Sequence, residues 1–136
     1  MTALAPVDAT NQWAELVVPG RLLSHNEERR SHWSHRARYT RGLREAVAMQ
    51  AMVARLPKGL AVVTVTAQAR QAKGARLADR LAYAPTVKAA IDGLVDYGLV
   101  ADDDQGHMDL RVAPNVRSDD GRPYLALLVE WNAPGA

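Results

Sequence analysis

The stretch that decides the fold lies near the middle of the chain, where residues 59–70 are GLAVVTVTAQAR. This stretch is rich in residues branched at Cβ, which follow one another without a break from Val62 to Thr66. Such side chains pack well on a pleated surface and are enriched in strands. The sequence therefore predicts a core strand at 59–70.

Three further strands are expected on either side of it. Upstream, residues 13–20 are WAELVVPG, a short strand that Pro19 and Gly20 stop. Downstream, residues 124–131 are YLALLVEW, a strong strand that follows the turn-forming run SDDGRP. Residues 108–114, MDLRVAP, predict a shorter strand.

Two segments predict helices. The first covers residues 36–56, ends at the run Pro57, Lys58 and Gly59, and has apolar residues at helical spacing. Those residues are Leu43, Ala46, Val47 and Val53. The second begins at Pro85, where a proline costs no hydrogen bond, and runs to Tyr97 before Gly98. Its expected buried stripe is Val87, Ile91, Leu94 and Val95.

The order of elements is β-α-β-α-β-β, which is typical of an α+β fold. We expect one domain over residues 1–136, with a small mixed or mainly antiparallel sheet and helices packed on one side. The polar stretch 21–36 and the basic stretch 71–80 are expected to be irregular. Residues 1–12 and 132–136 are expected to be flexible termini.

Composition narrows the class of protein. The chain has no cysteine, which excludes disulfides, iron–sulfur clusters and cysteine zinc sites. It has no apolar run near the roughly 20 residues of a membrane helix, and no signal-peptide pattern. A cytoplasmic protein that does not bind membranes is the expectation.

The net charge of +2 hides an asymmetry along the chain. Residues 1–88 carry 14 Lys and Arg against 6 Asp and Glu, whereas residues 89–136 carry 3 against 9. Of the 17 basic residues 14 are arginine, whose planar fork suits phosphate oxygens. A polyanion as partner is one explanation for the many arginines, and a GC-rich genome is the other.

Carboxylates are the first candidates for chemistry. Hydrolysis of a phosphodiester with Mg²⁺ needs oxygen ligands that leave room for water and a phosphate. The candidates are Asp79, Asp92 and the triplet Asp102, Asp103 and Asp104. For the triplet, a hydrated turn is the plain alternative.

Lys88 and Asp92 lie four residues apart on the second predicted helix. They can form a surface ion pair worth a few tenths of a kcal/mol. Alternatively, Lys88 holds a phosphate or stabilises charge that develops on it.

The histidines leave two possibilities open. His25, His32 and His35 could bind zinc, although no clear fourth ligand is near. The same stretch is also basic and carries Trp33, so it could contact phosphates and stack on bases. We favour the second interpretation.

Two segments together resemble one family. LLSHNEERRSHWSHRARYTRGLRE (22–45) resembles the N-terminal signature of RusA-like Holliday-junction resolvases, in the form common in actinobacteria and their phages. DRLAYAPTVKAAIDGLVDYGLVADDDQGH (79–107) is similar to the family's core signature, in which a PT-x-K-A-x-x-D-G-L-x-D-x-G run precedes two or three aspartates. The resemblance covers about residues 16–131, and the lysine-to-aspartate spacing is kept.

The resemblance implies a dimeric endonuclease that uses Mg²⁺ or Mn²⁺ to nick four-way DNA junctions. Lys88 corresponds to the catalytic lysine, Asp79 to the acid before the helix and Asp103 to the metal-binding acid after it. Asp92 and Asp102 are further candidate metal ligands. The residues expected to contact DNA are Arg29, Arg30, His32, Trp33, Arg36, Arg38, Arg41, Arg76 and Arg80.

One departure from the family pattern leaves alternatives open. Family members usually carry an Asn or an Asp-x-Asp-Asn run where this chain has Ala82, Tyr83 and Ala84. The chain could therefore be a degenerate member that binds branched DNA without cutting it. A small structural or partner-binding domain with a solvated acidic cluster is the third possibility.

Overall fold

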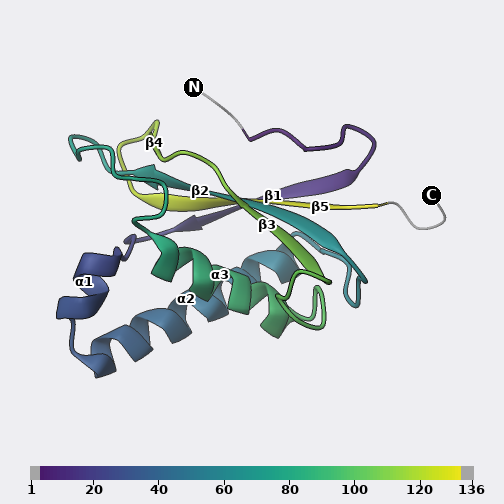
Figure 1. Ribbon diagram of the computed structural model, residues 1–136, viewed down its shortest axis with the longest axis horizontal. Helices are drawn as coiled ribbons and strands as arrows, with labels where there is room; N and C mark the ends of the chain where they lie inside the picture. The colour runs from purple at the N-terminus through teal and green to yellow at the C-terminus, as the bar shows by residue number, and fades with distance from the viewer. Residues whose placement is uncertain (1–3, 133–136) are drawn as a thin grey trace.

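A five-stranded mixed sheet with helices against one face forms the protein (Figure 1). The computed structural model describes residues 4–132, and the structural statements below concern these residues. The elements in chain order are β1 (Gln12–Pro19), α1 (His25–Arg30), α2 (Trp33–Val53), β2 (Val63–Gln71), α3 (Ala84–Tyr97), β3 (Met108–Val112), β4 (Val116–Arg117) and β5 (Tyr124–Trp131). The predicted α+β class, with a mixed sheet, is confirmed.

The C-terminal strand β5 lies inside the sheet. The strand order is β1-β5-β2-β3, and the short β4 also pairs with β2. β5 runs antiparallel to both β1 and β2, whereas β3 and β4 run parallel to β2. The connection from β2 through α3 to β3 is therefore a βαβ unit, the usual way to join parallel neighbours.

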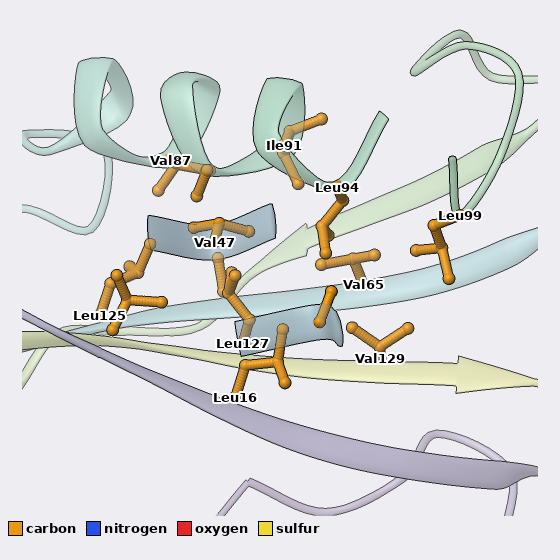
Figure 2. Close-up of a cluster of buried hydrophobic side chains, with 14 of the residues drawn as sticks. Leu16, Val47, Val65, Val87, Ile91, Leu94, Leu99, Leu125, Leu127 and Val129 are labelled. Atoms are coloured by element: carbon orange, nitrogen blue, oxygen red, sulfur yellow. The ribbon is translucent and has the colours of Figure 1, made fainter. Parts of the chain in front are cut away.

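The hydrophobic core lies between the sheet and the two long helices. Along β2 and β5, Val65, Leu127 and Val129 are fully buried on the helix side of the sheet. Ile91 and Leu94 of α3 reach toward them, as Figure 2 shows. Burial of these aliphatic side chains is the main driving force that holds α3 on the sheet.

Helices α2 and α3 cross closely at Gly93. A Cβ atom at this position would lie 2.7 Å from the Arg44 carbonyl oxygen and 2.9 Å from the Val47 Cβ. Both separations are shorter than side chains tolerate, so glycine is what permits the crossing. One turn further on, the Arg44 guanidinium donates two hydrogen bonds to the Asp96 carboxylate, at 2.7 and 2.8 Å.

The polar stretch 21–36 is not irregular, contrary to the expectation. It contains α1, and α2 begins at Trp33 rather than at residue 36. The Ser24 hydroxyl caps α1 by accepting a hydrogen bond from the Glu27 backbone N–H at 3.2 Å. A Ser followed three residues later by Glu is the capping-box pattern, so the sequence did carry a signal for this helix.

The apolar residues at helical spacing in α2 do not all face the core. Val47 and Ala51 are fully buried, but Ala46 is exposed and the side chain of Val53 is 71% exposed. At 3.6 residues per turn, Val53 points away from the face that carries Val47. The core strand also begins later than predicted, at Val63, and Leu60 makes only an isolated bridge with Val100.

The face of the sheet opposite the helices is buried at its centre, along β5, and exposed on β1, where Trp13 and Val17 are 53% and 46% exposed. Ala126, Leu128 and Glu130 of β5 are fully buried there. The Glu130 carboxylate accepts hydrogen bonds from the Val7 backbone N–H at 2.7 Å and the Asn11 side chain at 3.4 Å. Residues 7–11, which lie within the stretch expected to be flexible, are thus tied to the sheet. Among residues 4–132, no helix is both long and apolar enough to cross a membrane.

Candidate functional site

The start of α3 is fixed by a buried threonine. Pro85 lies in the first turn, and Thr86 is almost fully buried. The Thr86 hydroxyl accepts a hydrogen bond from the Leu23 N–H at 2.7 Å and donates one to the Leu23 carbonyl at 3.2 Å. It also lies 2.9 Å from the Tyr39 hydroxyl of α2. These bonds set the rotation of α3, which turns Lys88 outward.

Lys88 joins two carboxylates that come from different parts of the chain. Its ammonium lies 3.1 Å from Asp92 Oδ1, one turn along α3, and 2.5 Å from Asp103 Oδ2 in the loop after the helix. The Asp103 N–H in turn donates to Asp102 Oδ1 at 2.7 Å. Four of the five predicted site residues are therefore brought together, and we call Lys88, Asp92, Asp102 and Asp103 the lysine–aspartate cluster.

Within this cluster each charge stabilises the other. The hydrogen bond to Asp103, followed by that to Asp92, raises the pKa of Lys88 above its usual value. The hydrogen bond from Lys88 is also the largest cause that lowers the pKa of Asp103. The side chains of Lys88, Asp92 and Asp103 are 63%, 27% and 30% exposed, so solvent and an incoming ligand can reach all three. At neutral pH the lysine is cationic and Asp103 is ionised.

Asp79, the fifth predicted site residue, is engaged elsewhere. Its Oδ1 accepts a hydrogen bond from the Leu81 N–H at 3.1 Å, and its carbonyl accepts one from the Ala82 N–H at 2.9 Å. The carboxylate thus stabilises the turn that leads into α3. Within the described chain, no hydrogen bond or ion pair joins it to Lys88 or Asp103.

The third aspartate of the triplet belongs to a turn. Asp104 Oδ1 accepts hydrogen bonds from the N–H groups of Gly106 and His107, at 3.0 and 3.1 Å, and lies 2.7 Å from His107 Nδ1. The contact with His107 lowers the pKa of Asp104. The hydrated-turn interpretation therefore describes Asp104, whereas Asp103 faces Lys88.

Several residues that carry the family resemblance have structural roles. Pro85 starts α3, Thr86 docks it, Gly93 permits the helix crossing and Asp96 pairs with Arg44. Gly98 ends the helix with φ +97°, in the left-handed region that favours glycine. The residues of the lysine–aspartate cluster have no such structural role, and their side chains contact chiefly one another.

A pocket opens beside the cluster, between α3, β3 and the loop that precedes α3. Its volume is about 280 Å³. The lining residues are Arg80, Leu81, Ala84, Val87, Lys88, Ile91, Asp103, Met108, Leu110 and Val112. Except for the three charged residues at Arg80, Lys88 and Asp103, the lining is aliphatic or methionine.

Buried polar side chains hold the loop that forms one wall of this pocket. Gln71, at the end of β2, accepts from the Ala78 N–H at 2.8 Å and donates to the Arg76 carbonyl at 2.9 Å. Asn115 donates to the carbonyls of Ala78 and Asp79, at 3.0 and 2.9 Å. Sequence reasoning missed Gln71 and Asn115, because no local pattern indicates a contact between β2, the loop and residue 115. The basic residues Arg76 and Arg80 therefore stand on a fixed loop.

The predicted DNA-binding residues fall into two groups. Arg76 and Arg80 are exposed on this loop, and the His25 N–H at the start of α1 donates to the Ala82 carbonyl at 3.0 Å. The others lie at the end of α1, in the joint between α1 and α2, and along α2; they are Arg29, Arg30, His32, Trp33, Arg36, Arg38 and Arg41. Figure 1 shows α1 beyond the N-terminal end of α3.

Trp33 is an exposed aromatic residue of this second group. Its side chain is 67% exposed, and its ring lies 5.6 Å from the His32 ring. His32 Nδ1 accepts a hydrogen bond from the Ser34 N–H at 3.2 Å and so caps α2. Beside this joint lies a hollow of about 750 Å³, and its charged lining residues are the arginines Arg36, Arg41 and Arg44 and the acids Glu28, Glu45 and Asp96.

Among residues 4–132, no three Asp, Glu or His side chains gather as a ready-made metal site. The sequence matches no protein-family model, and no curated protein matches it.

Proposed function

We propose that the protein is a Mg²⁺-dependent, structure-selective endodeoxyribonuclease of the RusA-like type that binds and nicks four-way DNA junctions. The observation that carries this proposal is the convergence of Lys88, Asp92 and Asp103 at an exposed site. A cation between two carboxylates is an arrangement in which a phosphate and a metal ion can replace the internal ion pairs.

The donors of the cluster fit magnesium chemically. Mg²⁺ is usually bound through one or two carboxylates, with water and substrate phosphate completing the shell. Asp92 and Asp103 supply two carboxylates, and the Asp102 carboxylate accepts a hydrogen bond from the Asp103 N–H. The ion would supply an activated water and neutralise charge on the phosphate.

Lys88 has a part of its own in this scheme. When the two carboxylates bind a cation, they no longer hold the ammonium, which can then turn toward a phosphate oxygen. A fixed positive charge at that oxygen stabilises the additional negative charge of the transition state. The 63% exposure of the Lys88 side chain leaves room for this movement.

Binding of the DNA is assigned to the two basic groups. Their arginines would neutralise backbone phosphates, so recognition follows the shape of the DNA more than its base sequence. A homodimer would match the near-twofold symmetry of a four-way junction. Such an enzyme would act in the cytoplasm of a bacterial or phage-infected cell, in recombination and repair or in removing branches from DNA before packaging.

A junction-binding protein without nuclease activity is the second candidate. Asp79 is the observation that favours it, because its carboxylate caps its own turn. Ala82 and Ala84 offer no side-chain oxygen in the same turn. This candidate keeps the salt-sensitive binding and predicts no cleavage.

Cleavage of a labelled synthetic four-way junction tests the proposal. We expect paired nicks with Mg²⁺ or Mn²⁺ from the wild-type protein, and none from the Asp103→Asn variant. Asp119→Asn, an exposed carboxylate in the turn before β5, is the matched control and should cut normally. Binding is measured separately by gel shift in Ca²⁺. Binding without nicks in either metal selects the second candidate, and no preference for branched DNA rejects both.

A further inference from the structure

The pocket beside the lysine–aspartate cluster has the properties of a second binding site on the protein, next to the one that the proposed function assigns to the DNA strand that is cut. It opens at Lys88 and Asp103, where the proposed function places the phosphate that is cut. Beyond these two residues the pocket becomes apolar, with Val87 and Ile91 of α3 on one side and Leu110 of β3 on the other. A ligand that fits must therefore join an anionic group to an apolar body.

The pocket is built into the fold. β3 is the last strand of the sheet, and within residues 4–132 no further strand covers its outer edge. Ala84, at the start of α3, is too small to fill the space between the helix and β3. Gln71 and Asn115 hold the opposite wall through the loop carbonyls. The walls thus stand in place before any ligand arrives.

Two apolar side chains at the rim are unusually open to solvent. Leu81 is 57% exposed and Leu110 is 43% exposed. A flat apolar ligand between them would cover both, and covering apolar surface is favourable. Arg80 also lines the pocket, and the exposed Arg76 lies on the same loop, so an anion beside the apolar body is attracted.

We propose that this pocket binds an unpaired nucleobase of the strand whose phosphate lies at Lys88. The inference rests on the proposed function, since it needs DNA at the cluster. Every nucleotide joins the apolar face of its base, through the sugar, to a phosphate, and this combination of groups matches the pocket and the cluster beside it. Bases at a branch point lose stacking partners more easily than bases within a duplex, which makes them the bases available to enter.

The lining also predicts how selective the pocket is. Apart from Arg80, Lys88 and Asp103, its side chains carry no group that hydrogen-bonds to a base edge. The pocket therefore favours an unpaired base over a paired one and discriminates little among the four bases.

The test uses a four-way junction with a fluorescent adenine analogue at one branch-point position, bound in Ca²⁺. No aromatic residue lines the pocket, so a base that leaves the stack and enters it should fluoresce several-fold more strongly. Ala84→Leu fills the pocket and keeps a good helix former, and Leu81→Ser removes its exposed wall. Both variants should lose the rise in fluorescence and keep junction binding by gel shift. Leu77→Ser, on the same loop but outside the pocket, should behave as wild type.

The possible outcomes separate this inference from the proposed function. Junction binding without a fluorescence rise at any branch-point position overturns the base pocket and leaves DNA binding intact. A rise that persists in both Ala84→Leu and Leu81→Ser places the base elsewhere and also overturns it. No junction binding removes the proposed function and the inference with it. A dimer that Leu81→Ser converts to a monomer would assign the pocket to a second copy of the chain.

Discussion

Lys88 and Asp103 are fifteen residues apart in the chain, and the ammonium of one lies 2.5 Å from a carboxylate oxygen of the other. The pair joins α3 to the loop that follows it. An exposed ion pair contributes only about 0–1 kcal/mol to stability. The importance of the pair therefore lies in the positive and negative charges that it holds side by side at the surface.

The first prediction separates catalysis from stability at Lys88. Lys88→Met should change the free energy of unfolding by less than about 1 kcal/mol, because the ion pairs are solvent-exposed. If Lys88 acts on the phosphate, junction cleavage should fall by about 10²-fold or more, while junction affinity is kept. Denaturant unfolding and single-turnover cleavage measure the two effects. Equal cleavage by the variant would rule out a catalytic role for Lys88.

The second prediction concerns the crossing of α2 and α3. Gly93→Ala should destabilise the protein by about 1–3 kcal/mol, because the new methyl group overlaps the Arg44 carbonyl and Val47. Gly42→Ala in α2 is the matched control, since nothing lies within 4 Å of a Cβ there. That control should stabilise by about 0.5–1 kcal/mol through lower backbone entropy. Urea unfolding compares the two, and a neutral Gly93→Ala would contradict the close crossing.

A third prediction compares two threonines whose hydroxyl oxygens are buried. Thr86→Val removes the hydroxyl that satisfies the Leu23 N–H and carbonyl and should cost about 1–3 kcal/mol. The Thr66 hydroxyl is buried without a partner among residues 4–132, so Thr66→Val should be neutral or stabilising. Thermal unfolding of both variants gives the comparison. Equal losses in the two would show that the Leu23 contacts contribute nothing.

Acid should weaken the contact between the two long helices. The hydrogen bond from Arg44 lowers the pKa of Asp96 below its ordinary value of 3.8. Because the folded-state pKa is the lower one, the stabilisation is fully present above about pH 4 and is lost as the pH falls through the folded value. The stability difference between wild type and Asp96→Asn should therefore be present at neutral pH and vanish in acid. Unfolding measured from pH 2 to 7 decides this, and a difference that grew in acid would reverse the assignment.

The basic residues should act through phosphates. Arg36→Gln should reduce the slope of log affinity against log salt by about 0.9, the value for one lost phosphate contact on duplex DNA. Arg55→Gln, beyond the far end of α2, should leave the slope unchanged. Gel shifts on a junction at several salt concentrations provide the slopes. A change in Arg55→Gln equal to that in Arg36→Gln would show that charge alone, and not position, matters.

Much of the fold could be predicted from local patterns. The strands near residues 13–20, 59–70 and 124–131 and the helix from Pro85 to Tyr97 follow from periodicity and from residues that end elements. The sheet order could not be predicted, because the place of β5 between β1 and β2 depends on which faces pack together. α1 was missed because six polar residues carry no apolar stripe, and β4 because it has only two residues.

Part of the candidate site could likewise be predicted from the sequence, and part could not. The Lys88–Asp92 pair follows from helical spacing alone. The approach of Asp103 depends on how the loop returns along α3, and only the family resemblance led us to expect it. The turn roles of Asp79 and Asp104 depend on hydrogen bonds to nearby N–H groups, which aspartates commonly form in turns.

The βαβ unit from Val63 to Val112 contains the whole lysine–aspartate cluster and every residue that lines the adjacent pocket. The residues of the site therefore come from one uninterrupted stretch of the chain, and Leu23 and Asn115, outside that stretch, hold α3 and the loop in place.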